Sequence, residues 1–497
     1  MSIIEKMLGT NISWIQIMPT IPQRMYKEEI PAMYGDDHWR EMQEILGYYK
    51  IVLEGAPFVT NSTDDFKGAD LKYKLVKQLL YKEARFMASK PLEFSFKVNP
   101  TGESPEAIQA AAGIESDYKE VLDTILKSNL FDSKFVKAVK DCLIGKRVAL
   151  VANFNEDGVQ VNFLPSLEFI TEYDDISGKL VKFVAFYTIK ESTNANERRI
   201  YKKRYELKDG FCHITEGTYD GLGNPIEMEM EDFRTELEFI PAVVILNDGL
   251  TGDTKGESEV EWLFDEESWY SKLANADIDA ERRSMNPIRY TTDADPGSTK
   301  NLSTSAGAFW DLSTAADSDH SMGVGSLEPS MAYSGALDTT LGRIKYSMYD
   351  QLGVPNINLE TMSGTITSGK GMKAVYWDLI VRVEEKMLAW KPALATFVRY
   401  LIEGCRIYKD SMDIQMNGVE YNLPEESFQV IIENSYPIME DEAEEKAMDL
   451  AEVNSKTMSR KAYMKKWRNM SDDDIDAELK QIAAEREVLE NSFGGEL

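Results

Sequence analysis

The spacing of apolar residues along the chain changes from a helical period to a strand period and back. Apolar residues recur at the three-to-four spacing of amphipathic helices over 38–52, 66–89 and 117–129. From residue 148 onward, apolar runs separated by turn sequences such as EDG and DGLGNP are typical of strands. We therefore predict N-terminal helices and then a β-rich module of about five or six strands, which holds the runs RVALVANF, VQVNFLPSLEFITEY, LVKFVAFYTIKE, RRIYKKRYELKDGFCHITEG and FIPAVVIL.

The middle of the chain is predicted to hold two helices separated by a polar segment. A helix of about 29 residues follows Gly256, and Asn286-Pro287 ends it because proline disfavours helical geometry in the residue before it. Residues 288–333 are rich in Ser, Thr, Gly and Asp, with short apolar islands, and are predicted to form a small module of short strands. Helical periodicity returns between 337 and 352.

The C-terminal part is predicted to be mainly helical. A third long helix is expected over about 370–403, with a bend at Pro392, and a strand-like pair follows at 411–423 and 427–434. Three shorter helices are then expected at 439–453, 459–467 and 472–490, the last with Ser471 as its N-cap. The whole pattern predicts an α+β fold.

Composition narrows the possible partners. Lys and Arg total 55 against 85 Asp and Glu, so the net charge of −30 opposes tight static binding to a phosphate backbone. The three cysteines, Cys142, Cys212 and Cys405, form no CxxC motif, which argues against a disulfide scaffold or a zinc site and favours a reducing cytoplasm. No apolar run approaches the roughly 18 residues of a membrane span, and no export signal is expected.

One loop is similar to a nucleotide-binding motif. Residues 364–371, GTITSGKG, nearly match GxxxxGK[ST] and precede a predicted helix. However, Gly371 stands where a hydroxyl would hold magnesium, and the preceding NINLETM lacks the buried strand that positions such a loop. A mobile loop followed by a helix is the favoured interpretation, and a nucleotide-dependent DNA-processing enzyme is kept as an alternative.

The other candidate sites have simpler interpretations. Residues 153–158 mimic the first half of a calcium loop, but position twelve falls on Leu164 instead of a glutamate, so a hairpin turn is predicted. His38, His213 and His320 are isolated, with no nucleophile motif to pair with them. The basic cluster at 461–468 is predicted to be a solvated helical face, with contact to DNA as an alternative. No catalytic, cofactor or metal site is predicted.

The order of these elements resembles the portal proteins of tailed bacteriophages, of the type found in siphophages of Gram-positive hosts. FLPSLEFITEYDD with LVKFVAFYTI resembles the portal wing, and GESEVEWLFDEESWYSKLANADIDAERRSMNPIRY resembles the stem helix that enters the clip. GVPNINLETMSGTITSGKGMKAVYWDLIVRVEEKMLAWKPAL is similar to the segment with the tunnel loop and the long wing helix, and SRKAYMKKW with DDDIDAELKQIAAE resembles the crown.

The resemblance implies a portal-type domain organisation with an α/β wing, a two-helix stem, a small β-containing clip, a long kinked wing helix and a helical crown. The implied boundaries are 1–255 for the wing with its N-terminal helices and β-rich module, 256–285 for the first stem helix, 286–333 for the clip, 334–353 for the second stem helix, 354–369 for the tunnel loop, 370–436 for the long wing helix and β-pair, and 437–497 for the crown.

The resemblance also implies a non-enzymatic function without a cofactor. Portal subunits form a ring, twelve-fold in the capsid, at one vertex of the virion, and double-stranded DNA is packaged and ejected through this channel. The expected partners are further copies of the chain, passing DNA, the terminase, a head-completion or adaptor protein, and the major capsid and scaffolding proteins, but no membrane. Assembly would take place in the cytoplasm of the bacterial host. A scaffold of another phage-like particle is a further alternative.

Candidate site residues follow from this assignment. An acidic stem face would repel phosphates, basic stem residues would pair with neighbouring subunits or touch DNA briefly, the tunnel loop would offer hydroxyls and two lysines to passing DNA, and the clip would hold an apolar island. The acidic residues are Glu261, Asp265, Asp277 and Glu281, and the basic ones are Arg282, Arg283, Arg343 and Lys345. The loop residues are Thr361, Ser363, Thr365, Thr367, Ser368, Lys370 and Lys373, and the clip residues are Phe309 and Trp310.

Overall fold

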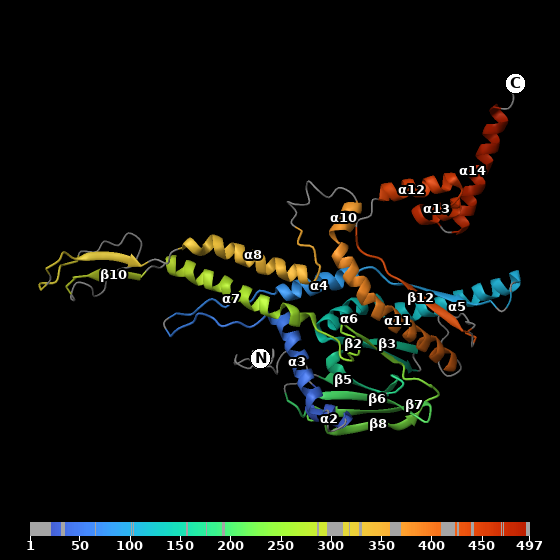
Figure 1. Cartoon of the computed structure of the whole chain (residues 1–497). Helices are drawn as coiled ribbons and strands as arrows, with labels where there is room; N and C mark the ends of the chain where they lie inside the picture. The colour runs from blue at the N-terminus through green and yellow to red at the C-terminus, as the bar shows by residue number, and fades with distance from the viewer. Residues whose placement is uncertain are drawn as a thin grey trace. The chain divides into compact units, whose positions relative to one another are not determined.

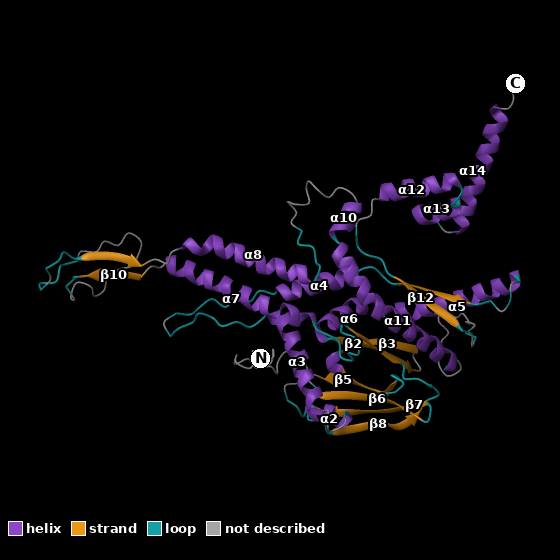
Figure 2. Cartoon of the chain, in the orientation of Figure 1, coloured by secondary structure: helices purple, strands orange, loops and turns teal. Residues whose placement is uncertain are grey.

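The computed structural model of the chain is an α+β protein, as the sequence predicts (Figures 1 and 2). It describes residues 21–493 except 31–34, 65, 101, 103, 156–157, 175, 191–193, 286–287, 296–311, 318, 328–330, 358–368, 409–422, 425–426, 439–441, 469 and 471. The chain divides into two compact units. One holds Met1–Asn356 and Asp378–Tyr436, and the other holds Ile357–Trp377 and Pro437–Leu497.

Helices dominate the described part of residues 21–145. The predicted helix at 38–52 is confirmed by α3, and that at 117–129 is the second half of α5, which begins earlier because Ser104 caps it by accepting from the Ala107 amide at 3.2 Å. The predicted helix at 66–89 is helical only from Leu75, as α4. The described helices of this part are α2 (Gln23–Glu29), α3 (Gly35–Glu54), α4 (Leu75–Ala88), α5 (Pro105–Ser128) and α6 (Phe131–Gly145).

The predicted β-rich module forms two antiparallel sheets. The predicted run at 159–173 is in fact two strands, because the turn that starts at Pro165 moves the chain from one sheet to the other. The first sheet has the order β3-β2-β9, and its strands are β2 (Arg147–Asn155), β3 (Gly158–Pro165) and β9 (Ala242–Leu246). The second has the order β4 to β8, and its strands are β4 (Phe169–Tyr173), β5 (Leu180–Lys190), β6 (Arg199–Lys208), β7 (Phe211–Asp220) and β8 (Pro225–Arg234).

A shared apolar core holds these two sheets. Val151 and Leu164 of the first sheet are buried in one cluster with Phe169, Phe183 and Tyr205 of the second. The hairpin predicted in place of a calcium loop is confirmed, because β2 and β3 pair as far as Asn155 opposite Gly158. Strand β8 was not predicted, although Ile226, Met228 and Met230 alternate with glutamates at the strand period, and nearly all of its residues are exposed.

Two small sheets complete the described β structure of the first unit, Met1–Asn356 with Asp378–Tyr436. β10 (Ile288–Thr292) and β11 (Gly323–Leu327) pair antiparallel, which confirms short strands within 288–333. β12 (Phe428–Glu433) confirms the strand expected at 427–434, but it pairs antiparallel with β1 (Glu93–Val98). Its predicted partner at 411–423 lies almost entirely outside the described residues.

The long helices lie close to their predicted positions. α7 (Glu259–Met285) and α8 (Ser334–Gln351) run side by side, and the β10–β11 sheet is joined to the end of this pair (Figure 1). The helix predicted over 370–403 is divided at Tyr376 into α10 (Gly369–Val375) and α11 (Trp377–Ile407), and α11 continues through Pro392.

The second unit holds the three predicted C-terminal helices. They are α12 (Glu442–Ser455), α13 (Arg460–Arg468) and α14 (Asp472–Phe493). The expected capping residue of the last helix, Ser471, lies outside the described residues.

Candidate functional site

The helices α7 and α8 occupy the positions predicted for the two stem helices. Polar contacts fasten them to each other at both ends of the pair. The Gln351 side-chain amide donates to Glu266 at 2.8 Å, and the Tyr333 hydroxyl donates to Asp277 at 3.1 Å. The pair leaves large aromatic side chains in solvent, with Trp269 54% and Tyr346 63% exposed. The subunit alone therefore does not bury the apolar surface of its helix pair.

A buried polar stripe runs along one face of α7. Glu267, Ser271, Asn275 and Asp279 recur every fourth residue, and all four are buried. Solvent exposure is the ordinary expectation for such residues, so the sequence analysis did not single out this stripe. The spacing of four was the signal that could have revealed it.

The stripe binds the backbone of the segment before α4. The amides of Ala69, Leu71 and Leu75 donate to Asp279 (2.8 Å), Asn275 (2.8 Å) and Glu267 (3.1 Å), respectively. The Asn275 amide group also donates to the Leu71 carbonyl at 2.7 Å. These bonds satisfy backbone groups that a helix would have satisfied internally, which explains why α4 begins only at Leu75. Burial raises the pKa of Glu267 to about 8.

A buried group of charges joins the base of α7 to α4 and α11. Glu83 and Glu259 are fully buried, and Arg382 donates to them at 3.1 Å and 2.6 Å. Lys386 donates to Glu259 at 2.6 Å and to Asn247, just after β9, at 2.8 Å. Burial, together with the neighbouring Glu259 charge, raises the pKa of Glu83 to about 8. Three helices and a strand end therefore meet at one charged junction.

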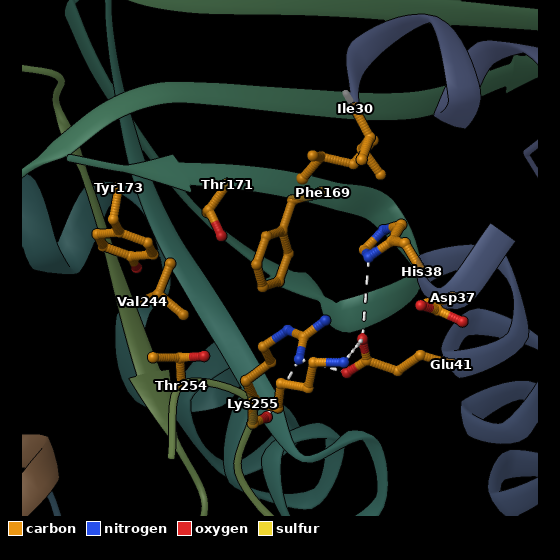
Figure 3. A pocket seen from close by; sticks show the side chains of 12 residues that line it. Ile30, Asp37, His38, Glu41, Phe169, Thr171, Tyr173, Val244, Thr254 and Lys255 are labelled. Atoms are coloured by element: carbon orange, nitrogen blue, oxygen red, sulfur yellow. Dashed lines mark hydrogen bonds and ion pairs between the residues drawn. The ribbon is translucent and has the colours of Figure 1, made fainter. Parts of the chain in front are cut away.

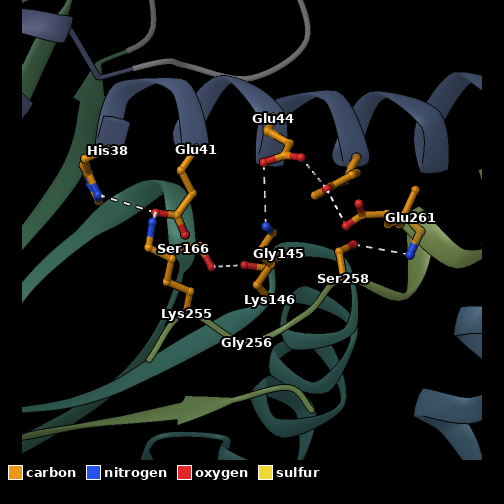
Figure 4. A network of polar contacts seen from close by, with 12 residues as sticks. His38, Glu41, Glu44, Gly145, Lys146, Ser166, Lys255, Gly256, Ser258 and Glu261 are labelled. Carbon is orange, nitrogen blue, oxygen red and sulfur yellow. Dashed lines mark hydrogen bonds and ion pairs between the residues drawn. The ribbon is translucent and has the colours of Figure 1, made fainter. Parts of the chain in front are cut away.

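Backbone contacts fix the turn into α7 (Figure 4). Ser258 donates to the Ile144 carbonyl at 2.6 Å, and the Tyr48 hydroxyl donates to Glu261 at 3.1 Å. Gly256 has a φ of +73°, and a Cβ there would lie 2.3 Å from the Lys146 carbonyl oxygen. Only glycine fits this close approach, so the glycine that precedes the predicted helix has a structural role.

The predicted stem residues have different surroundings. Asp265 and Glu281 are exposed on α7, whereas Glu261 and Asp277 accept the tyrosine hydrogen bonds described above. Arg343 donates to Thr340 at 3.1 Å, and Lys345 is half-buried.

Two of the predicted basic residues have partners within the subunit. Arg282 donates to Asp279 at 3.3 Å and to the Lys67 carbonyl at 3.0 Å. The Arg282 and Arg283 guanidinium groups also lie 5.0 Å and 4.5 Å from the centre of the Phe66 ring. Intersubunit pairing is therefore not needed to explain either arginine.

The described residues include few of the predicted tunnel-loop and clip residues. Thr361, Ser363, Thr365, Thr367 and Ser368 lie outside the described residues, as do Phe309, Trp310 and the Lys370 side chain. Lys373 is exposed on α10. This helix begins at Gly369, close to the start predicted at about residue 370.

A cavity of about 440 Å³ lies beside α3, and no pattern in the sequence predicted it (Figure 3). Glu41 lies in it, with Arg147 at 2.7 Å, Lys255 at 3.4 Å and His38 at 3.8 Å. Burial lowers the pKa of His38 to about 4, so this histidine is neutral at neutral pH. Burial also works to raise the pKa of Glu41, but the Arg147 charge and hydrogen bond hold it below its usual value. The charges of this cavity are mutually paired.

The basic cluster of the second unit is also paired internally. Lys461 contacts Asp476 at 3.1 Å, and Lys466 contacts Asp449 at 2.8 Å. The Trp467 ring nitrogen donates to the same Asp449 at 2.7 Å. These contacts join α13 to α12 and α14. Lys465, Lys466 and Arg468 are exposed, so the predicted solvated helical face is confirmed.

The described residues contain no group of three or more His, Cys, Asp or Glu that could hold a metal ion. Within the same residues, no helix is both long and apolar enough to cross a membrane. All three cysteines are free and buried. Burial raises the pKa of the Cys142, Cys212 and Cys405 thiols well above the usual range, which makes them poor nucleophiles.

The described residues thus define an α+β protein with a fastened pair of long helices that ends in a small sheet. A model of the family described as phage portal protein, SPP1 Gp6-like, matches residues 313–490, about a third of the chain. The match supports a phage portal protein of the SPP1 siphophage type, and the predicted resemblance is confirmed. A search of the curated proteins finds no match.

The family connects the chain to bacteriophage DNA packaging and the head–tail connector. It implies an oligomeric ring at a capsid vertex that interacts with the capsid and the packaging machinery, and it points to a structural protein and not to an enzyme. The match extends from just before β11 to α14, so α7 and the two larger sheets, β3-β2-β9 and β4 to β8, lie outside it.

Proposed function

We propose that the chain is the subunit of a portal ring, twelve-fold in the capsid, through which double-stranded DNA is packaged and ejected. The observation that carries this proposal is the α7–α8 pair, which is anchored at its base by buried charges and leaves Trp269 and Tyr346 in solvent. Such a pair gains stability when neighbouring copies cover its apolar surface. The family match over 313–490, which includes α8, supports the same function.

In this proposal α7 and α8 form the stem, the segment with β10 and β11 forms the clip, and the two larger sheets with their helices form the wing. The long helix α11 belongs to the wing, and α12, α13 and α14 form the crown. The exposed carboxylate of Glu281 would be repeated around the ring, where it weakens contact with passing phosphates. The clip would bind the terminase and the head-completion protein, and the outer surface the capsid and scaffolding proteins.

The loop at 354–369 would face the channel. Its glycines, hydroxyl side chains and the lysines Lys370 and Lys373 would touch DNA without holding it. This loop has no enzymatic role in the proposal, because Gly371 replaces the hydroxyl that a magnesium-dependent nucleotide site requires.

A packaging assay with two loop variants tests this function. Deletion of 361–368 should permit ring formation but reduce DNA packaging or retention. The wild type should not hydrolyse nucleotide, so Lys370→Ala should leave the measured hydrolysis unchanged. Rings that package and retain DNA normally after the deletion would contradict the role of the loop. ATP turnover by the purified wild type that Lys370→Ala abolishes would instead favour the DNA-processing enzyme.

A further inference from the structure

A cluster of cations surrounds one tyrosine on the surface formed by α4 and α6. Lys77, Tyr81 and Arg85 follow at four-residue spacing on α4, and Lys137 and Lys140 lie on α6, which packs against α4. The Lys77 and Lys140 ammonium groups lie 5.4 Å and 4.4 Å from the centre of the Tyr81 ring. We call these five residues the α4–α6 basic patch.

The patch holds four like charges, which the nearby Asp141 carboxylate offsets only in part. Burial and the nearby Arg85, Lys137 and Lys77 charges lower the pKa of Lys140, and Asp141 offsets this only in part. The Asp141 carboxylate itself accepts from the Tyr49 hydroxyl at 3.2 Å. Among the described residues none of the four cations forms an ion pair, in contrast to the paired cluster of α13. On a chain with a net charge of −30, such a patch fits an acidic partner.

The same chain presents an acidic surface with a similar layout on α7. Glu261, Asp265 and Trp269 also follow at four-residue spacing, and all three are exposed. Carboxylates complement lysine and arginine. The Lys272 ammonium group already lies 4.7 Å from the centre of the Trp269 ring, so the two carboxylates provide the complementary charge of this face. We call these three residues the α7 acidic face.

The two surfaces lie on opposite sides of the α4–α7 contact. α4 meets α7 through Leu75, whose amide donates to Glu267, and through Glu83, which shares Arg382 with Glu259. At 100° per residue, Tyr81 lies about 200° around α4 from Glu83. Asp265 likewise lies about 200° around α7 from Glu267. The basic patch and the acidic face therefore point away from each other within one subunit and cannot pair there.

We propose that the α4–α6 basic patch of one subunit binds the α7 acidic face of the next. The inference rests on the proposed ring, and it names the surfaces that close it. Complementary patches on opposite sides of one subunit form a head-to-tail interface, which generates a ring when the rotation closes. The favoured partner is thus a second copy of this chain, and DNA on the basic patch is the competing outcome.

Charge reversal and its rescue test this interface. The first variant reverses two exposed charges of the basic patch, Arg85→Glu and Lys137→Glu. The second reverses the two carboxylates of the acidic face, Glu261→Lys and Asp265→Lys. The matched control reverses Lys119 and Lys127, two exposed lysines of α5. Native mass spectrometry across concentrations should show at least about tenfold weaker association for each reversal, wild-type association for the control, and recovery when all four reversals are combined.

Glu261 accepts a hydrogen bond from the Tyr48 hydroxyl, so its replacement by lysine could disturb the fold. A neutral variant controls for this effect. Glu261→Gln with Asp265→Asn keeps the hydrogen-bond acceptor and should still weaken the ring and reduce its sensitivity to salt. Rings formed equally well by every variant would overturn the interface while leaving the ring intact. Basic-patch variants that assemble normally but lose DNA binding would assign the patch to DNA. A wild type that never assembles would overturn the proposed function itself.

Discussion

The Lys386 ammonium group lies 2.6 Å from the Glu259 carboxylate, and this buried contact joins the long helix α11 to the first turn of α7. Arg382 joins the same two helices at 2.6 Å and extends the contact to Glu83 of α4. Because both cations contact the buried Glu259 carboxylate, the position of α7 depends on these charges.

Removing one cation should therefore destabilise the subunit strongly. Lys386→Met leaves the buried Glu259 carboxylate with a single cation, Arg382, and breaking a buried pair in this way costs about 3–5 kcal/mol. Chemical denaturation should show a lower free energy of unfolding. Arg399→Met, at an exposed position of the same helix, is the control and should change it little. Equal effects of the two variants would mean that the charged junction does not hold the fold together.

Stability should also depend on pH through Glu267. Burial raises its pKa from about 4.5 to about 8, so between these values the folded state keeps a proton that the unfolded state has released. The contribution of this group is present below pH 4.5 and is lost as the pH rises through 8. Glu267→Gln cannot titrate, so its stability relative to wild type should increase across this window, by on the order of a few kcal/mol.

Unfolding curves measured from pH 5 to pH 9 provide the test of Glu267. Glu281→Gln removes one exposed carboxylate from the same helix and controls for the change in net charge. A difference between Glu267→Gln and wild type that stays constant over this range would contradict the buried, protonated state of Glu267.

The bonds between α7 and the segment before α4 should be visible by hydrogen exchange. Asn275→Ala removes both partners of Leu71, whose amide and carbonyl bond to that side chain at 2.8 Å and 2.7 Å. Mass spectrometry should detect faster exchange in peptides that cover 66–75, because their amides lose protection. Lys272→Ala, at an exposed position of α7, should leave this exchange unchanged. Unaltered exchange in Asn275→Ala would show that the stripe does not order the segment.

The segment 288–333 should be replaceable without loss of the subunit fold. Within the described residues, β10 and β11 pair only with each other, so their sheet adds nothing to the larger sheets. A short linker in place of 288–333 should keep the circular dichroism spectrum close to wild type and abolish binding of the adaptor or terminase. Global unfolding of this variant would refute the clip assignment.

Local patterns were sufficient to predict most of the long elements. Apolar periodicity and the Gly256 and Pro287 boundaries predicted α7, and the same periodicity predicted α8 and the three C-terminal helices. The order of these elements was enough to indicate the portal family. Each of these signals lies within a single stretch of sequence, which is why sequence alone could reveal it.

Long-range contacts could not be predicted in the same way. The pairing of β1 with β12 joins distant parts of the chain, and no local pattern specifies the partner of a short strand. Glu83, Glu259 and Lys386 belong to residue types that are ordinarily exposed to solvent. Only the fold reveals that their side chains are buried together. The residues that would touch DNA were proposed through the resemblance alone, since a hydroxyl-rich loop has no chemical motif of its own.

Electron microscopy of the purified chain determines whether it assembles as a portal. A portal subunit should give ring-shaped particles with an axial channel, formed by copies of the chain packed side by side around it. Native mass spectrometry of the same sample would count the subunits. Monomers across micromolar concentrations and a range of salts, or closed assemblies without a channel, would contradict the assignment of this chain as a portal subunit.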